Sequence, residues 1–216
     1  MTDVQAKPAS APWTKPVASA LLVLADGTVI EGVGLGAAGH AVGEVCFNTA
    51  MTGYQEILTD PSYAGQIITF TFPHIGNVGT NEEDIEAVNM ASAAGARGVI
   101  LQASITDPAN HRSKKHLDRW LEARGIIGLC GVDTRALTAL IREKGMPNAV
   151  IAHAPDGRFD LAALKKEAKD WPGIDGMDLV PGVTAAQRYT WDETTWTLGE
   201  GYGRQTAPKR HVVAID

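Results

Sequence analysis

The amino-acid sequence predicts an α/β fold in which packed helices cover a mixed sheet, and three observations carry this prediction. Two aliphatic runs within residues 20–32 flank Asp26-Gly27, a dipeptide that strongly favours a tight β-hairpin turn. From residue 97 onward, short apolar runs alternate with amphipathic helical patterns, an order typical of parallel strands. The chain of 216 residues is 44% hydrophobic and 20% charged, so it can bury a core without disulfides or metals.

The amino-terminal elements follow from local composition. Residues 1–18 contain three prolines and no hydrophobic period, which predicts a flexible arm. The hairpin is expected next, and residues 32–43, which include five glycines, are expected to form a loop. A dinucleotide-binding turn is the weaker alternative for these glycines, because a strand rather than a helix is predicted after Gly43.

The stretch 44–79 is predicted to hold three strand-like runs, around residues 45–47, 57–58 and 67–72, joined by turn-forming residues. A helix is predicted to begin at Thr80 or Asn81, because three acidic residues follow and favour the amino-terminal end of a helix. The periodic patterns after it predict strands at 97–102, 126–130 and 148–154, and helices at 113–125, 134–144 and 161–168.

Asp133 and Asp160 stand immediately before the last two of these helices and are predicted to cap them. The pattern is weaker toward the carboxyl end of the chain. It predicts a turn-rich segment, a strand rich in threonine and tryptophan, a polar linker and an apolar strand, at residues 171–184, 189–198, 199–210 and 211–216.

Charge and hydropathy exclude several classes of partner. The net charge is −6 and the lysines and arginines are scattered, so no nucleic-acid partner is expected. No membrane contact is expected either, because no run approaches the roughly 20 apolar residues of a membrane span. The apolar run at residues 17–25 continues into the hairpin without a cleavage site, which argues against a signal peptide. Cys46 and Cys130 lie in separate apolar runs, a pattern that favours a reducing, cytoplasmic location.

The residues that could carry chemistry give weak signals by themselves. Cys130 in GLCGV could be a nucleophile, but the predicted helix starts three residues later, so a buried structural cysteine is the preferred interpretation, as it is for Cys46. The six histidines lack the spacing of metal ligands, and no metal site is expected. Glu56 and Asp60 are interpreted as structural rather than as an acid–base pair.

Ser62 is the most informative of these residues. In Asp60-Pro61-Ser62-Tyr63 the proline fixes φ, so a tight turn can present the serine hydroxyl outward to a polar ligand. The residues alone favour a plainer interpretation, in which the serine only hydrogen-bonds the backbone of its own turn.

A long stretch that includes this turn favours the first interpretation, in which Ser62 faces a ligand. The segment FNTAMTGYQEILTDPSYAGQIITFTFPHIGNVGTNEEDIEA resembles the signature of the small chain of carbamoyl phosphate synthetase. The resemblance continues through ARGVI, GVDTRALTALIREKG, WPGIDGMDLV and TWTL to HVVAID, and covers roughly residues 19–216.

The resemblance implies a β/β/α domain of the swivelling type at residues 19–198 and a linker at 199–210. It also implies that residues 211–216 are the first strand of a truncated class I glutamine amidotransferase domain, whose Cys-His-Glu triad would lie beyond them. The family's first domain packs on a large subunit, and its DPSY serine joins the glutamine pocket. The position that matches this serine is Ser62. No catalytic residue and no cofactor is expected in this chain, since ATP and Mg²⁺ belong to the large subunit.

The implied function is the small, glutamine amidotransferase subunit of a cytoplasmic heterodimer. It supplies ammonia from L-glutamine, and the large subunit makes carbamoyl phosphate from this ammonia, bicarbonate and ATP for arginine or pyrimidine biosynthesis. Without the triad, this chain alone is expected to be inactive. The alternative is a stand-alone, non-catalytic docking module for a synthetase-like partner. The apolar run at residues 211–216 favours the first interpretation, because a self-sufficient module would not expose an unpaired strand.

Overall fold

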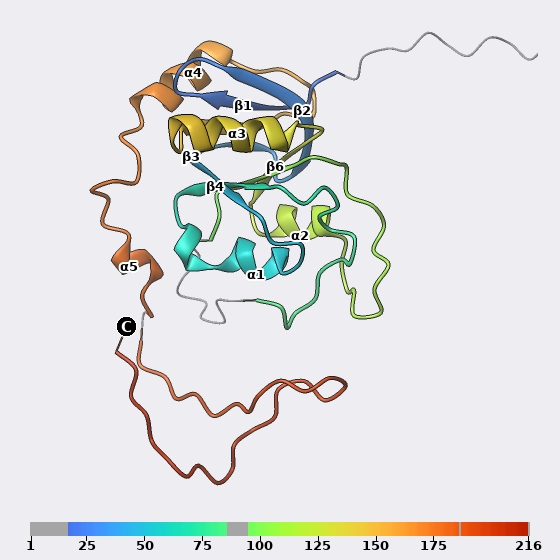
Figure 1. Cartoon of the computed structure of the whole chain (residues 1–216), viewed down its shortest axis with the longest axis vertical. Helices are drawn as coiled ribbons and strands as arrows, with labels where there is room; N and C mark the ends of the chain where they lie inside the picture. Colours follow the sequence, from blue (N-terminus) through green and yellow to red (C-terminus); the bar gives the residue numbers. More distant parts are fainter. Residues whose placement is uncertain (1–16, 86–94, 186, 216) are drawn as a thin grey trace, which may run out of the picture.

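The computed structural model of the chain describes residues 17–85, 95–185 and 187–215, and in it seven strands close into a barrel with helices outside (Figure 1). The strands follow one another around the barrel in the order β1-β2-β6-β5-β4-β3-β7. They are β1 (Ala20–Leu24), β2 (Val29–Gly36), β3 (Gly39–Asn48), β4 (Gln66–Phe70), β5 (Gly98–Leu101), β6 (Ile127–Cys130) and β7 (Asn148–His153). The helices are α1 (Tyr54–Thr59), the 3₁₀ turn η1 (Pro61–Tyr63), α2 (Leu117–Ala123), α3 (Thr134–Lys144), α4 (Leu161–Asp170) and α5 (Val180–Val183).

The barrel is mixed, as the sequence predicts. Strands β3, β4, β5 and β6 are parallel neighbours, whereas β1, β2 and β7 pair antiparallel with the strands beside them. The hairpin predicted at Asp26-Gly27 is confirmed, with Leu22 opposite Ile30. The later strands and the α/β alternation are also confirmed, and the predicted bounds of β5, β6 and β7 differ from the observed ones by at most one residue.

The core follows the two-residue period of the strands. In β1, Ala20, Leu22 and Leu24 join a cluster that draws on β3, β4, β5, β6 and β7 and on helix α3. The alternate residues Leu21 and Val23 instead contact α4. A third cluster places α1 and α2 against other strand residues (Figure 1), so helices cover the barrel where its outward residues are apolar.

The expectation of a loop at residues 32–43 is wrong. Strand β2 continues to Gly36 and β3 begins at Gly39, so only two residues separate them. Four of these glycines, Gly32, Gly34, Gly36 and Gly43, lie where a Cβ would meet neighbouring atoms at less than 3 Å. A Cβ on Gly34 would stand 2.0 Å from the His153 ring, and a Cβ on Gly32 would stand 2.4 Å from the Cys130 carbonyl oxygen.

Two of the predicted elements in the middle of the chain are corrected. Ile57 and Leu58 lie in helix α1 instead of a strand-like run, because Gly53 at φ +78° turns the chain into a short helix that buries Leu58. Helix α2 begins at Leu117 rather than at residue 113, and the His116 ring accepts a hydrogen bond from the Asp118 N–H at its start.

The predicted caps are confirmed. The Asp133 and Asp160 carboxylates accept hydrogen bonds from the Ala136 and Ala163 N–H groups. The Asn81 side chain accepts from the N–H groups of residues 83 and 84, but residues 82–85 form no helical turn, so the predicted helix start at Thr80 or Asn81 is not confirmed. The helix predicted to follow falls mostly at 86–94, outside the described residues, as does most of the arm predicted at 1–18.

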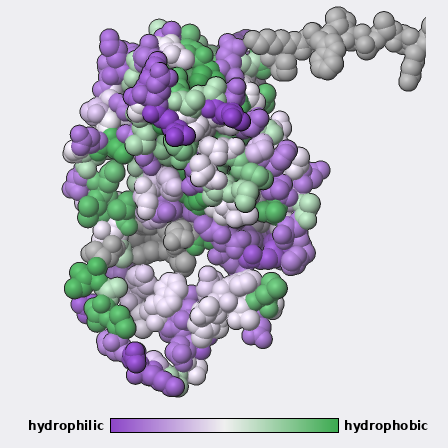
Figure 2. Space-filling view, in the orientation of Figure 1, coloured by the Kyte–Doolittle hydropathy of each residue, from purple (hydrophilic) through white to green (hydrophobic). Residues whose placement is uncertain are grey.

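The carboxyl-terminal strands predicted at 189–198 and 211–216 are not formed in the described part of these segments. Residues 189–198 contribute only two isolated bridges, Glu193 with Arg204 and Thr197 with Gly201. Residues 211–215 are exposed and belong to no strand. Figure 1 shows the segment after residue 187 running along an extended path beyond the barrel, and Figure 2 shows an apolar patch where α5 lies. None of the helices in the described ranges is both long and apolar enough to cross a membrane.

Candidate functional site

The turn that carries Ser62 follows directly from helix α1. Asp60 is extended, at φ −71° and ψ 120°, and joins α1 to the 3₁₀ turn η1. One oxygen of its carboxylate accepts a hydrogen bond from the Ser62 N–H at 2.8 Å. The acid therefore caps the turn, and Asp60 has the structural role that the sequence predicts. The Ser62 side chain is exposed, and its hydroxyl makes no hydrogen bond to the protein among the described residues.

The same turn is fixed to the barrel from its other end. The Tyr63 hydroxyl accepts a hydrogen bond from the Asn48 side-chain amide at 3.0 Å. The Asn48 side-chain oxygen in turn accepts from the Ala50 N–H at 2.8 Å, and the Asn48 carbonyl accepts from the Thr71 N–H. Asn48 therefore ties together the turn that carries Ser62 and the loops that leave β3 and β4.

This attachment joins the turn that carries Ser62, which leads into the amino end of β4, to the carboxyl end of β3. Asn48 is the last residue of β3, and β3 and β4 are parallel, so their carboxyl ends lie at the same end. Loops at the carboxyl ends of parallel strands are the usual location of ligand sites in α/β folds. Exposed Met51 and Val78 lie in the loops that follow β3 and β4, which gives this end an apolar component.

Helix α1 also connects the turn to the loop that follows β4. Gln55 is buried, with 3% of its surface exposed, and its side-chain amide donates to the Asn81 carbonyl at 2.6 Å. The Asn81 N–H donates back to the Gln55 side-chain oxygen at 2.9 Å. Beyond Asn81, Arg112 donates to Glu83 at 3.1 Å and to Asp84 at 2.7 Å. The hydrogen bond to Asp84 is the main cause of the raised pKa of Arg112.

The two cysteines are buried, as predicted. Burial, with a smaller contribution from Glu44, raises the pKa of Cys46 to about 11. Burial also raises the pKa of Cys130, whose sulfur lies 4.0 Å from the Ser104 hydroxyl. A reactive cysteine needs a lowered pKa and access to solvent, so neither residue is placed to act as a nucleophile.

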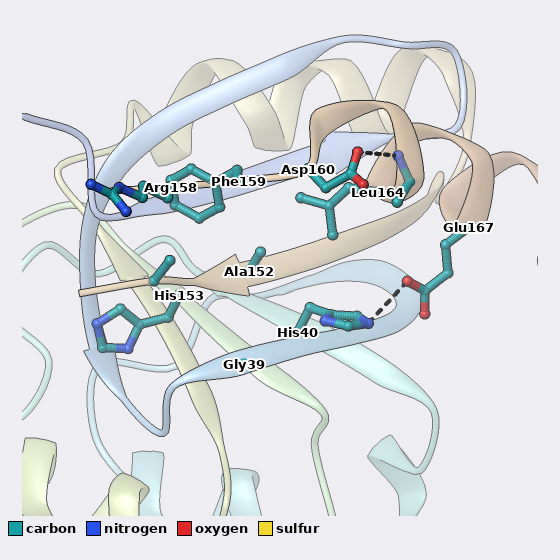
Figure 3. A pocket seen from close by; sticks show the side chains of 11 residues that line it. Gly39, His40, Ala152, His153, Arg158, Phe159, Asp160, Leu164 and Glu167 are labelled. Atoms are coloured by element: carbon teal, nitrogen blue, oxygen red, sulfur yellow. Dashed lines mark hydrogen bonds and ion pairs between the residues drawn. The ribbon is translucent and has the colours of Figure 1, made fainter. Parts of the chain in front are cut away.

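Metal-ligating side chains are dispersed in the part of the chain that the structure describes, and no three of the histidine, cysteine and acidic side chains there could hold one ion. A hollow of about 230 Å³ lies between β3, β7 and α4 and contains His40, His153 and Arg158 (Figure 3). Most of its polar groups already have partners. His40 pairs with Glu167 at 3.2 Å, the His153 ring hydrogen-bonds the Ala37 carbonyl at 3.1 Å, and Asp160 caps α4. Its chemistry therefore indicates structural contacts more than a ligand site.

Comparisons with known proteins agree with one another. Residues 22–151 match the family model described as the carbamoyl-phosphate synthase small chain, CPSase domain. The carbamoyl phosphate synthase small chain of Bradyrhizobium diazoefficiens is 74% identical over 204 residues, which are 94% of this chain and 52% of the relative. That of Mesorhizobium japonicum is 66% identical over 94% of this chain and 51% of its own length. That of Brucella anthropi is 61% identical over 100% of this chain and 53% of its own length. The chain spans about half the length of the curated relatives it matches.

Proposed function

The chain belongs to the carbamoyl-phosphate synthase small-chain family, and on this premise we propose that it forms the subunit-docking part of a glutamine amidotransferase subunit. In this proposal the complete small chain releases ammonia from L-glutamine. A large subunit, which would hold ATP and Mg²⁺, joins the ammonia to bicarbonate as carbamoyl phosphate. The observation that carries the proposal is the family match over residues 22–151, which contain the exposed Ser62 on its fixed turn.

The role proposed for Ser62 is to bind glutamine. A serine hydroxyl can both donate and accept a hydrogen bond, so it suits the amide or the charged groups of an amino acid. The turn is already held by the Asp60 carboxylate and by the hydrogen bond between Asn48 and Tyr63. A side chain on a prearranged turn loses little freedom when a ligand binds, so the hydrogen bond can contribute to affinity.

The chemical step is assigned outside this chain. Hydrolysis of glutamine to glutamate and ammonia requires a nucleophile, and the only two cysteines of the sequence are buried with raised pKa values. We therefore expect purified chain of residues 1–216 to release no glutamate from glutamine above a blank. Measurable release by this chain would contradict the assignment.

The proposal is tested with the complete small chain assembled with the large subunit. Ser62→Ala should raise the KM for glutamine several-fold, because a single lost hydrogen bond of about 0.5–1.5 kcal/mol corresponds to roughly a 2- to 12-fold change. Carbamoyl phosphate synthesis from added ammonia should not change. Ser104→Ala, which removes an exposed hydroxyl near Cys130, is the matched control. An unchanged KM for glutamine in Ser62→Ala, or equal loss with both nitrogen sources, would refute the role of Ser62.

A further inference from the structure

The segment of residues 187–215 makes few contacts with the other residues that the structure describes. Every residue in this segment is exposed except Trp196 and Gly201, which are half-buried. Trp196 contacts the Glu83 side chain, and Gly201 lies beside it. The Trp196 indole N–H donates to the Glu83 carboxylate at 3.1 Å, and a Cβ on Gly201 would lie 3.6 Å from the other oxygen of Glu83. Within the described ranges, the contact with Glu83 and its ion-pair partner therefore attaches a long exposed segment.

Trp196 is held on its ring face as well as on its edge. The guanidinium carbon of Arg112 lies 5.1 Å from the centroid of the Trp196 ring, within the range of a cation–π contact. The same guanidinium donates to Glu83 and Asp84. Arg112 and Glu83 thus form an ion pair that presents both a cation to the face of the indole and an acceptor to its N–H.

Backbone hydrogen bonds join the residues on the two sides of Trp196. The Thr194 N–H donates to the Gly203 carbonyl at 2.9 Å, and Thr197 and Gly201 exchange two backbone hydrogen bonds at 3.0 and 2.8 Å. The Asp192 carboxylate and the Arg204 guanidinium lie 3.6 Å apart at the open end of this hairpin. Residues 192–205 therefore form a narrow hairpin, and Trp196 near its tip is the side chain that inserts against the body.

The contact of Trp196 is connected to the turn that carries Ser62. Glu83 and Asp84 are held by the Asn81 side chain, which accepts their N–H groups at 2.8 and 2.9 Å. Asn81 is bound to Gln55 by two hydrogen bonds, and Gln55 belongs to α1, the helix that leads into η1. A continuous series of short contacts therefore joins the hairpin to the candidate ligand turn.

We propose that Trp196 is a positioning residue, which holds the hairpin 192–205 on Glu83 and Arg112 and so fixes where the following chain lies relative to Ser62. This inference rests on the proposed function, in which a further half of the small chain completes the glutamine pocket. An unattached hairpin would let that half approach Ser62 in many orientations. The pocket would then form less often, and the KM for glutamine would rise without any loss of the chemistry that uses ammonia.

The test uses the complete small chain with its large subunit, in the variants Trp196→Ala, Trp196→Phe and, as control, Trp191→Ala. Trp191 is an exposed tryptophan five residues earlier in the same segment. The first measurement is the rate of tryptic cleavage after Arg204, which should rise about tenfold in Trp196→Ala and remain unchanged in Trp191→Ala. Trp196→Phe keeps the ring over Arg112 and loses the N–H donor, so its cleavage rate should be intermediate.

The second measurement is the KM for glutamine, which should rise at least fivefold in Trp196→Ala while synthesis from ammonia is unchanged. Unchanged cleavage in both Trp196 variants would overturn the attachment. Faster cleavage with an unchanged KM would overturn the positioning role.

If the proposed function itself fails, the parent enzyme will show no synthesis that depends on glutamine and Ser62→Ala will have no effect. The cleavage rates would still report on the hairpin.

Discussion

Gln55 and Asn81 exchange two hydrogen bonds through one side chain. The Asn81 N–H donates to the Gln55 side-chain oxygen, and the Gln55 amide donates to the Asn81 carbonyl, at 2.9 and 2.6 Å. The glutamine amide thus satisfies both backbone groups of a loop residue, much as a neighbouring strand would. Since Gln55 is almost fully buried, water cannot replace either bond. The link between α1 and the loop after β4 therefore depends on an amide at this position.

The variant Gln55→Glu is expected to lower the free energy of unfolding by about 1–3 kcal/mol. A carboxylate can still accept from the Asn81 N–H, but it cannot donate to the Asn81 carbonyl and would oppose it with negative charge. Urea unfolding followed by circular dichroism measures the change. Gln102→Glu places the same charge at an exposed position and is the control. Equal stability of the two variants would show that the exchange of hydrogen bonds is unimportant.

Tyr54 provides a second prediction about the same helix. Its hydroxyl donates to the Gly79 carbonyl, and 4% of the residue is exposed. Tyr54→Phe should cost about 1 kcal/mol of unfolding free energy, because the buried carbonyl loses its donor. Tyr202→Phe, at a position that is 51% exposed, should leave stability unchanged. Thermal and urea unfolding at pH 7 would detect the difference, and a neutral Tyr54→Phe would contradict it.

Stability should also fall at high pH. Burial is the main cause that raises the pKa of Tyr54 to about 12, from 10.0, and the pKa of Cys46 to about 11, from 9.0. The unfolded chain therefore loses these protons at lower pH than the folded chain does. Their contribution to stability is complete below pH 9 and is lost progressively between about pH 9 and pH 12. In Tyr54→Phe the free energy of unfolding should depend less steeply on pH between 10 and 12. Parallel curves for the parent and the variant would refute this.

The cysteines should react slowly with thiol reagents in the folded protein. With a pKa near 11, about one Cys46 side chain in a thousand is a thiolate at pH 8, and it is 7% exposed. Ellman's reagent should therefore label both cysteines at the rate of unfolding, and immediately in concentrated guanidinium. Fast labelling of one thiol in the native protein would show that a cysteine is accessible and would reopen its role as a nucleophile.

The helix caps could be predicted because they depend on neighbours in sequence. Asp133 and Asp160 each accept from an N–H three residues later. The strands within residues 32–43 could not be predicted, because Gly32 and Gly34 make room for Cys130 and His153, which are far along the chain. Helix α1 could not be predicted either, because six residues are too few to show a helical period.

The candidate site also combines features that depend on sequence neighbours with features that depend on distant residues. The exposed turn of Ser62 follows from Asp60 and Pro61, so it was visible in the sequence. The attachment of this turn depends on a hydrogen bond between Asn48 and Tyr63, which are 15 residues apart in the sequence. The contact between Trp196 and Glu83 spans 113 residues and gives no local signal at all. Local sequence thus indicated which residue could face a ligand, and only the structure revealed what holds it in place.

The glycine contacts give a further prediction. A Cβ on Gly128 in β6 would stand 1.9 Å from the Leu35 side chain and 3.1 Å from the Leu35 carbonyl oxygen. Gly128→Ala should therefore destabilise the protein by about 1–3 kcal/mol through overpacking. Gly182→Ala, in α5 where nothing lies within 4 Å of the new methyl group, is the control and should be neutral or slightly stabilising. Equal unfolding curves for the two variants would contradict the close packing of β2 on β6.

The closed barrel has a consequence for recognition. Each of its seven strands is flanked by two others, and β2 and β3 pair with one neighbour over the first part of their length and with the other neighbour over the second part. A closed sheet has no edge strand, so the described barrel offers no edge to which a foreign peptide or a second copy of the chain could add a strand. Any partner must instead recognise the protein by its side chains and by the loops at the barrel ends.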